Sequence, residues 1–292
     1  MKTGIIGAGR VGCSLGKYFR GKGADLVGYY DTDTAAAQEA AAFTQTSVFE
    51  QVSQLVRESE LLFITTPDAL LVPVWEEIKG MSHRNQIICH CSGALSSDSF
   101  SGAEDAGVFC CSVHPMLPFS NRFSSYQQLE HAFFTVEGHP HAVQAITGLL
   151  TSYGNEVCTI DAAAKPEYHA AASILSNQVI AVLDMGYQLL EDCGFSREKA
   201  VSATAALVRS NIENVIAQDC IQALTGPIER GDVSTVKKHL NCLNAEDAAL
   251  YRMLGTRLLA LSEAKHPSQD AAAMKHVLNV DETEKENGGV HK

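Results

Sequence analysis

The sequence lacks any long apolar segment. None of its hydrophobic runs approaches the roughly 20 residues that a membrane-spanning helix needs. Met1-Lys2-Thr3 leads directly into a strand pattern, without the longer apolar region and small-residue cleavage site of a secretory signal. We therefore expect a cytoplasmic protein with no membrane partner.

Positive charge is also scarce. Lys and Arg total 22 against 34 Asp and Glu, which gives a formal net charge of −12. A nucleic-acid partner would require clustered cations that displace counterions from the phosphates. This balance argues against nucleic acid and leaves a small molecule as the expected partner.

The cysteine count is odd, at nine. An odd number cannot form a complete disulfide framework, so we expect reduced thiols. Two short clusters invite a zinc interpretation: Cys89, His90 and Cys91, then Cys110, Cys111 and His114. Neighbours within a strand point to opposite faces, unlike the loop-borne ligands of structural zinc sites, so no metal is expected.

Short apolar runs alternate with helix-like stretches from Lys2 to about Cys158. This βαβ rhythm predicts an α/β fold with a doubly wound, mostly parallel Rossmann-type sheet over residues 1–160. The expected strands are Thr3–Ile6, Asp25–Tyr30, Leu61–Thr65, Gln86–Cys91, Val108–Val113 and Phe133–Glu137. The expected intervening helices are Gly12–Gly21, Thr34–Ala42, Val48–Glu58, Leu70–Lys79 and His141–Tyr153.

Strand signals stop after Asp161. Pro166 opens one long helical stretch to Asp192, and Ser196 caps a second that runs to about Asp219. We therefore expect an all-helical substrate and dimerisation domain over residues 161–280. Residues 281–292 are polar and predict a mobile tail.

A glycine fingerprint follows the first expected strand and opens the first helix. Gly7 permits a tight turn, Gly9 lets the backbone approach a pyrophosphate, and Gly12 allows close helix–strand packing. The helix N-terminus then offers free N–H groups and its positive dipole end to the phosphates. The fingerprint thus predicts dinucleotide binding by Gly7, Ala8, Gly9, Arg10, Val11 and Gly12.

The residue at the end of the second strand bears on the choice of dinucleotide. A carboxylate at Asp31 can accept hydrogen bonds from the adenosine ribose and repels a 2′-phosphate, which favours NAD over NADP. Arg10 is the nearby cation that could restore NADP binding, and Asp31 could also be an ordinary turn residue. The expected cofactor is NAD or NADP, with NAD preferred.

Two further strand ends should line the nicotinamide side. Pro67 ends one strand, and the hydroxyls of Thr66 and Ser92 can reach ribose or carboxamide groups. Ordinary loop chemistry is the alternative. His114 follows the next strand and could edge the same cleft, or it could be a structural histidine.

A polar stripe marks the first long helix. Lys165, His169, Ser173 and Asn177 recur every four residues, which places them along one helix face. His169 suits proton transfer because its unperturbed pKa is near 6.5, Asn177 could orient substrate, and Lys165 could bind an anionic group. The stripe could instead face solvent or join a helix–helix hydrogen-bond network.

A second motif is the segment Thr225-Gly226-Pro227, followed closely by Arg230. A broken helix exposes backbone N–H groups beside a hydroxyl and a guanidinium, which suits a carboxylate or phosphate. The same residues could simply stop one helix and cap the next.

Together these segments resemble a family of Rossmann-like oxidoreductases whose helical C-terminal domain has no known function. The resemblance implies kinship with pyrroline-5-carboxylate reductase and the 6-phosphogluconate and β-hydroxyacid dehydrogenases, which dimerise through the helical domain. Two features depart from these patterns. Asp31-Thr32 replaces a frequent Ser-Arg pair, and Ser173 stands four residues before Asn177, where the β-hydroxyacid dehydrogenases have a lysine. The motifs that carry the resemblance are Gly7–Gly12, Thr66–Asp68, His90–Gly93, His114-Pro115, Tyr168–Ala171, Asn177, Thr225–Pro227 and Arg230–Asp232.

The expected function is an NAD(P)-dependent reductase or dehydrogenase acting on a small anionic oxo, hydroxy or imino acid in an interdomain cleft. His169, Asn177 and Lys165 are the candidate catalytic residues. Ser173, Thr225, Arg230 and His114 are the candidate substrate-binding residues. The alternatives are a non-catalytic dinucleotide-binding regulatory module and a thiol-redox role for the cysteines.

Overall fold

The computed structural model describes residues 1–278. The chain divides into two compact units between Val179 and Ile180. This division falls later than the expected boundary at residue 160, because the helix that begins at Lys165 is anchored to the sheet of the first unit. The expected tail, residues 281–292, lies outside the described residues.

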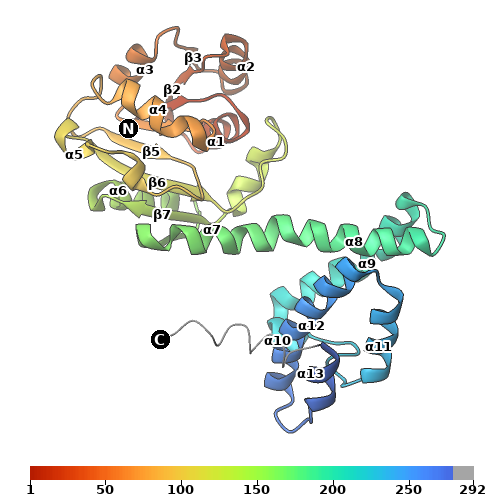
Figure 1. The fold of residues 1–292 in the computed structure, drawn as a ribbon. Coiled ribbons are helices and arrows are strands. Elements are labelled where there is room, and N and C mark those ends of the chain that lie inside the picture. Colours follow the sequence, from red (N-terminus) through yellow and green to blue (C-terminus); the bar gives the residue numbers. More distant parts are fainter. Residues whose placement is uncertain (279–292) are drawn as a thin grey trace. The chain divides into compact units, whose positions relative to one another are not determined.

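The first unit is built on an eight-stranded sheet, counted over residues 1–278, in the order β3-β2-β1-β4-β5-β6-β7-β8 (Figure 1). All neighbours pair in parallel except β6 and β7. This confirms the doubly wound, mostly parallel Rossmann-type sheet. The strands are β1 Lys2–Ile6, β2 Asp25–Tyr30, β3 Ser47–Val48, β4 Leu61–Ile64, β5 Ile87–His90, β6 Phe109–Pro115, β7 Phe134–Gly138 and β8 Val157–Thr159.

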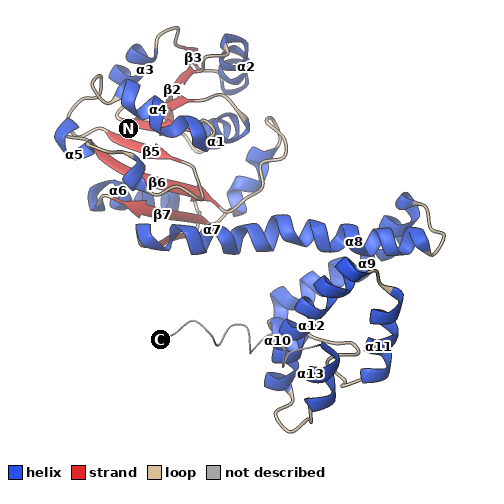
Figure 2. Cartoon of the chain, in the orientation of Figure 1, coloured by secondary structure: helices blue, strands red, loops and turns tan. Residues whose placement is uncertain are grey.

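Helices cover both faces of the sheet (Figure 2). Alternate residues of β4 show the two cores: Phe63 belongs to a cluster that includes residues of α1, α2 and α6, and Leu62 to a cluster that includes residues of α3 and α4. Within the described chain, the helices of this unit are α1 Arg10–Gly21, α2 Thr34–Thr44, α3 Val52–Glu58, α4 Asp68–Ile78, α5 Ala103–Ala106, α6 Pro140–Ser152 and α7 Lys165–Ser173.

Two edge strands were not foreseen from the sequence. The stretch Val48–Glu58 is not helical throughout, because Ser47–Val48 form β3 beside β2 and α3 begins at Val52. The three residues of β8 pair with β7 at the other edge. Strands of two or three residues are too short to show an alternating pattern, so only pairing with a neighbour identifies them.

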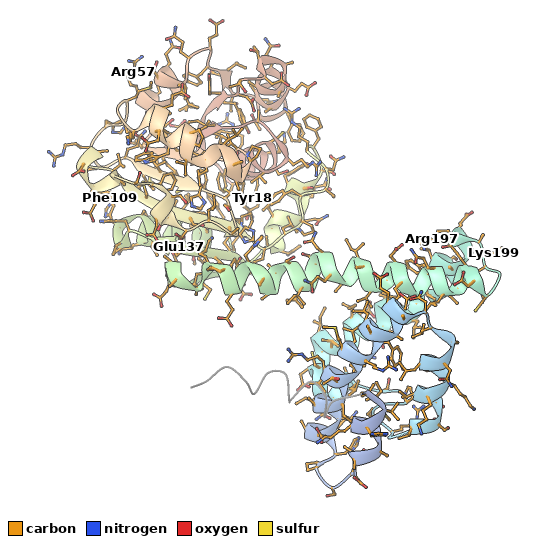
Figure 3. All side chains as sticks on the ribbon, in the orientation of Figure 1. Tyr18, Arg57, Phe109, Glu137, Arg197 and Lys199 are labelled. Carbon is orange, nitrogen blue, oxygen red and sulfur yellow. The ribbon has the colours of Figure 1, made fainter. Side chains whose placement is uncertain are left out.

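The second unit is helical throughout its described residues, as the sequence predicts. The predicted cap at Ser196 is confirmed, since its side chain accepts from the Lys199 N–H. Asn244 caps the helix that begins at Ala245 in the same way, by accepting from the Asp247 N–H. Arg197 donates to Asp184 and Glu191, which ties α9 to α8 (Figure 3). The helices are α8 Val179–Asp192, α9 Arg197–Gln218, α10 Cys220–Ala223, α11 Val233–Cys242, α12 Ala245–Lys265 and α13 Ala272–Leu278.

The long helix expected from Pro166 to Asp192 is interrupted. A π-helical segment, Ile174–Gln178, separates α7 from α8. Side chains four residues apart drift by about 40° around an α-helix, whereas a wider π turn takes more residues and counters this drift. The segment therefore keeps Asn177 closer to the face of His169 than a continuous α-helix would.

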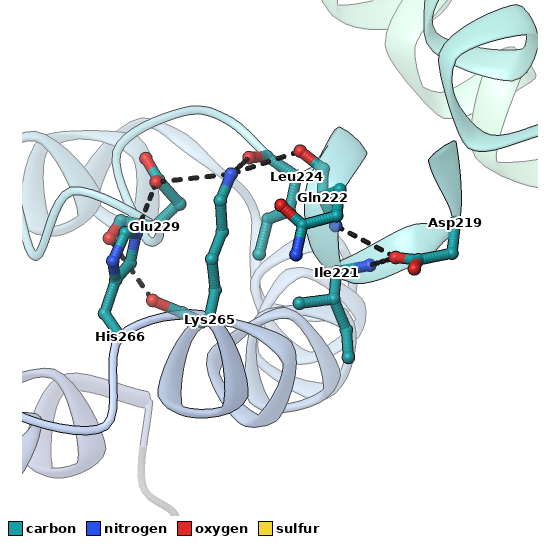
Figure 4. A network of polar contacts seen from close by, with 8 residues as sticks. Asp219, Ile221, Gln222, Leu224, Glu229, Lys265 and His266 are labelled. Carbon is teal, nitrogen blue, oxygen red and sulfur yellow. Dashed lines mark hydrogen bonds and ion pairs between the residues drawn. The ribbon is translucent and has the colours of Figure 1, made fainter. Parts of the chain in front are cut away.

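A polar network secures the Thr225–Arg230 segment to α12 (Figure 4). Lys265 Nζ donates to the carbonyl oxygen of Leu224 at 2.8 Å and of Gln222 at 3.2 Å, and it lies 3.6 Å from Glu229 Oε1. His266 Nε2 lies 2.7 Å from the same carboxylate oxygen.

Among the described helices of the whole chain, none is long and apolar enough to cross a membrane.

Candidate active site

The sheet order reverses between β1 and β4. The chain runs outward to β2 and β3 on one side of this point and to β5 and β6 on the other. Ligands of doubly wound folds bind outside the carboxyl ends of the strands at such a switch point. The glycine fingerprint, Thr65-Thr66 and Ser92 all follow strands at this edge, and His114 lies at the end of β6.

The fingerprint glycines have the conformations and contacts that the sequence predicts. Gly7 has a φ of +98°, and its N–H donates to the Tyr30 carbonyl at 2.8 Å. A Cβ at Gly12 would overlap the Gly7 carbonyl oxygen and the Thr65 hydroxyl. A Cβ at Gly9 would meet nothing within 4 Å, so this position faces open space next to the helix start.

The N-terminus of α1 has no side-chain cap. The first N–H groups of a helix lack intrahelical acceptors, so those of Arg10 and Val11 are available to an anion. Asp31 stabilises two loops. Its Oδ2 accepts from the Ala8 N–H, between β1 and α1, at 2.6 Å, and its Oδ1 accepts from the Asp33 N–H, between β2 and α2, at 2.9 Å. A carboxylate has about four acceptor positions, so Asp31 can still accept from a ribose hydroxyl.

Thr65, which the sequence did not single out, fixes the turn from the other side. Its hydroxyl lies 2.8 Å from the Gly7 carbonyl oxygen and 3.1 Å from that of Ile6. The next hydroxyl, Thr66 Oγ1, is buried and has no hydrogen-bond partner among the described residues. Pro67 follows directly and occupies the N-cap position of α4. An unpaired buried hydroxyl is expected where a ligand supplies the missing partner.

Ser92 sits in a rigid turn after β5. Its Oγ donates to Asp68 Oδ2 at 2.8 Å and accepts from the Leu95 N–H at 3.0 Å. His90 supports this turn, because its Nδ1 accepts from the Ser92 N–H and its Nε2 lies 3.2 Å from the Ser96 carbonyl oxygen. Burial lowers the pKa of His90 to about 4, so the ring is neutral near pH 7.

Lys165 is buried and hydrogen-bonded to the protein, whereas the sequence predicts that its side chain binds an anionic group. Its side chain is 1% exposed. Nζ donates to Ser112 Oγ at 2.7 Å and to the Ser92 carbonyl at 2.9 Å, and burial lowers its pKa. Because Lys165 begins α7, these bonds fix the start of that helix to the ends of β5 and β6.

Three side chains gather around Gly93. His114 Nδ1 lies 2.6 Å from the hydroxyl of Tyr168, which neighbours His169 in α7. A Cβ at Gly93 would lie 2.8 Å from His114 Nε2 and 2.9 Å from His169 Cδ2. Both imidazoles therefore lie against the backbone at Gly93, where a larger residue would collide with them. Burial lowers the pKa of His114 to about 4, while His169 is exposed.

The remaining candidates lie further along the chain. Ser173 ends α7, and Asn177 is exposed within the π-helical segment. Thr225 and Arg230 belong to the second unit and are both exposed. Within the first unit, the structure thus brings together Ser92, His114, Lys165 and His169 at one edge of the sheet.

Sequence reasoning gave no role to Tyr168 or Ser112, although both contact predicted site residues. Ser112 is the polar residue within the otherwise apolar run Phe109–Val113, which was a usable signal. Tyr168 belongs to the Tyr168–Ala171 motif that carries the resemblance, but its contact with His114 depends on how α7 packs against β6.

The cysteine clusters contribute to the core. Cys89 Sγ lies 3.3 Å from Cys111 Sγ across adjacent strands, and both side chains are fully buried. Burial raises the pKa of Cys89 well above its usual value, so its reactive thiolate form is disfavoured. No group of histidine, cysteine and acidic residues within residues 1–278 is arranged to hold a metal ion.

Comparison with known domains matches both parts of the chain. Residues 1–115 match the Rossmann-like domain, and residues 132–258 match a domain of unknown function, DUF2520. The chain therefore combines a Rossmann-like domain with a DUF2520 domain, which confirms the resemblance inferred from the motifs. No curated protein matches the chain in sequence.

Several solved structures share the fold over nearly their whole length. A Thermotoga maritima protein is 21% identical with a TM-score of 0.72, over 90% of this chain and 99% of that one. A pyrroline-5-carboxylate reductase from Coxiella burnetii is 12% identical with a TM-score of 0.61, over 92% and 99%. An imine reductase from Myxococcus stipitatus in complex with NADP+ is 15% identical with a TM-score of 0.61, over 96% and 99%.

Proposed function

We propose that this chain is an NAD(P)-dependent oxidoreductase acting on a small anionic oxo, hydroxy or imino acid. One observation carries the proposal: the dinucleotide fingerprint and the cluster of His114, Tyr168 and His169 lie at the same carboxyl edge of one sheet. The reductases that share the fold support the reaction class, and one of them binds NADP+.

The residues at the switch point fit a dinucleotide. Gly9 faces open space, α1 lacks a side-chain cap, and the buried Thr66 hydroxyl lacks a partner among residues 1–278. Bound there, the nicotinamide cofactor would supply or accept a hydride. The residues that would hold it are Gly7, Ala8, Gly9, Arg10, Val11, Gly12, Asp31, Thr66, Pro67 and Ser92.

NAD is the preferred cofactor in this proposal. Asp31 stands at the end of β2 with both carboxylate oxygens fixed by backbone N–H groups, so it cannot easily turn away from a 2′-phosphate. Arg10 is exposed at the start of α1 and is the cation that could offset this repulsion. Replacing Asp31 with Ser should therefore shift affinity towards NADPH.

The site residues would divide the remaining tasks. His169, which is exposed, would donate or accept the proton, and Asn177 would orient the substrate. Lys165 would position the Ser92 turn through its two hydrogen bonds. Within the first unit, Ser173 would bind the anionic group, and Thr225 and Arg230 stay candidate substrate-binding residues of the second unit.

Cofactor binding and turnover test the proposal separately. NADH and NADPH would be titrated by intrinsic fluorescence, and then a panel of 2-oxo, 3-hydroxy and cyclic imino acids would be assayed at 340 nm. We expect micromolar NADH binding and turnover of at least one panel member, reduced at least 100-fold in His169→Ala. Cofactor binding without any turnover would favour the non-catalytic regulatory module, and an absence of binding would refute both.

A further inference from the structure

His114 and Tyr168 form a fixed pair although they lie 54 residues apart. The rings meet edge to face, with centroids 5.6 Å apart and an interplanar angle of 89°. The phenol oxygen lies 2.6 Å from His114 Nδ1. His114 comes from β6 and Tyr168 from α7, so the packing of this helix on the sheet sets the orientation of the imidazole.

The chemistry of the pair sets the tautomer of His114. A phenol is a better proton donor than a neutral imidazole N–H, and an imidazole nitrogen is the better acceptor. Burial raises the pKa of Tyr168, and the hydroxyl of Thr135, the partner of His114 across β6 and β7, acts in the opposite direction through a hydrogen bond to the phenol. With Tyr168 donating to Nδ1, the proton of neutral His114 resides on Nε2.

The Nε2–H group has no protein acceptor among residues 1–278. Nε2 is not one of the fully buried side-chain atoms without a partner, so part of its surface is accessible. It lies beside Gly93, close to His169 of α7. A ligand group that reaches Nε2 would therefore meet a hydrogen-bond donor from His114 next to the exposed His169.

A neutral imidazole that presents its N–H group binds hydrogen-bond acceptors and disfavours donors. Because burial lowers the pKa of His114 to about 4, the ring stays neutral near pH 7. A carbonyl or hydroxyl oxygen can accept from Nε2–H, whereas the N–H of a protonated imine would face it donor to donor. Such a mismatch in a buried site is a strong basis for rejecting a substrate.

We propose that His114 Nε2–H binds the reacting oxygen of an oxo or hydroxy acid, that Tyr168 is the positioning residue for this donor, and that cyclic imino acids are not substrates. This inference rests on the proposed function, since it assigns the substrate class of the same site. It separates this chain from the imine-reducing enzymes that share its fold.

The second unit contains a matched control. His239 Nδ1 lies 2.9 Å from the hydroxyl of Tyr251, with ring centroids 5.8 Å apart and an interplanar angle of 81°. Tyr251→Phe therefore removes the same kind of bond as Tyr168→Phe, in the other unit. Any effect specific to Tyr168→Phe then reports on the site and not on the general loss of a tyrosine hydroxyl.

The experiment uses the full chain, with NADH and oxamate as probes. The ¹⁵N spectrum of the histidines gives the tautomer of His114, with His114→Asn identifying its signals, and titration gives the dissociation constant of oxamate at saturating NADH. In the wild type and in Tyr251→Phe we expect the Nε2–H tautomer and oxamate binding. In Tyr168→Phe we expect a mixture of tautomers and at least tenfold weaker oxamate binding, with unchanged NADH affinity.

Other results separate this inference from the function on which it rests. If NADH binds but oxamate does not, or if Tyr168→Phe changes neither the tautomer nor the oxamate affinity, the role of the pair is refuted and the proposed function stands. Faster turnover of a cyclic imino acid than of any oxo acid would also overturn it. If NADH itself does not bind, the proposed function fails and this inference fails with it.

Discussion

At the scale of single residues, the fingerprint glycines differ in what a methyl group would meet. Gly9 has a φ of −72° and open space around it, so Gly9→Ala should change the free energy of unfolding by less than about 0.5 kcal/mol. Its methyl group would occupy the path of the pyrophosphate, and NADH affinity should fall at least tenfold. Thermal unfolding and fluorescence titration measure the two effects.

Substitutions at Gly12 and Gly21 are the controls for Gly9→Ala. Gly12→Ala should cost about 1–3 kcal/mol of stability, because its Cβ would overlap Gly7 and Thr65. Gly21, at the other end of α1, also has open space, so Gly21→Ala should retain both stability and NADH binding. If Gly9→Ala binds NADH as Gly21→Ala does, the fingerprint is not the pyrophosphate site.

The buried histidine behind Ser92 predicts a pH dependence of stability. Unfolded His90 takes up a proton near pH 6.5, but the folded ring does so only near pH 4. Between these values the unfolded state binds more protons, so the free energy of unfolding falls as the pH drops from 6.5 to 4. His114 acts in the same direction.

Urea unfolding at pH 7 and pH 5 measures this loss. His90→Gln should lose less stability than the wild type between the two pH values, because one titrating group has been removed. His131→Gln, which replaces an exposed histidine, should lose as much as the wild type. Equal losses in all three proteins would contradict the neutral, buried state of His90.

At the scale of elements, the π-helical segment between α7 and α8 sets which face carries Asn177. Inserting one alanine after Leu175, which is 74% exposed, should rotate Asn177 by about 100° relative to His169. We expect kcat/KM to fall at least tenfold while NADH affinity is retained. Steady-state kinetics and circular dichroism check these outcomes.

Leu175→Ala is the control, because it keeps the length of the segment and changes only an exposed side chain. It should have nearly wild-type turnover. If the insertion variant turns over as fast as Leu175→Ala, Asn177 has no role that depends on its helix face.

At the scale of the whole molecule, the helical unit leaves much apolar surface exposed. Ala200 is the buried residue of the 22-residue helix α9, while Ile212 and Ile216, one turn apart on the same face, are 49% and 80% exposed. Exposed apolar side chains that lie together on a folded protein mark interaction surfaces. We therefore expect a homodimer formed through this unit, in line with the family resemblance.

Sedimentation equilibrium tests the dimer. The wild type should sediment as a dimer, and Ile212→Glu with Ile216→Glu should shift it towards the monomer. Asn211→Glu adds a carboxylate to an exposed polar position of the same helix and should leave the dimer intact. A wild-type monomer would refute the expectation directly.

Features that depend on neighbouring residues could be predicted from the sequence. Gly7, Gly9 and Gly12 require a particular local backbone, and the buried strands of four or more residues are largely apolar. Helix caps such as Ser196 and Asn244 are local in the same way. Fold class and the place of the dinucleotide site follow from these patterns.

Only the tertiary structure decided which polar side chains face a ligand and which face the protein. The four-residue spacing treats Lys165 and His169 alike, but packing of α7 on the sheet buries the first and exposes the second. The same packing brings Tyr168 to His114, and pairing of β5 with β6 brings Ser112 beside the Ser92 turn. These contacts join residues distant in the chain, so their geometry is set by the packing of whole elements.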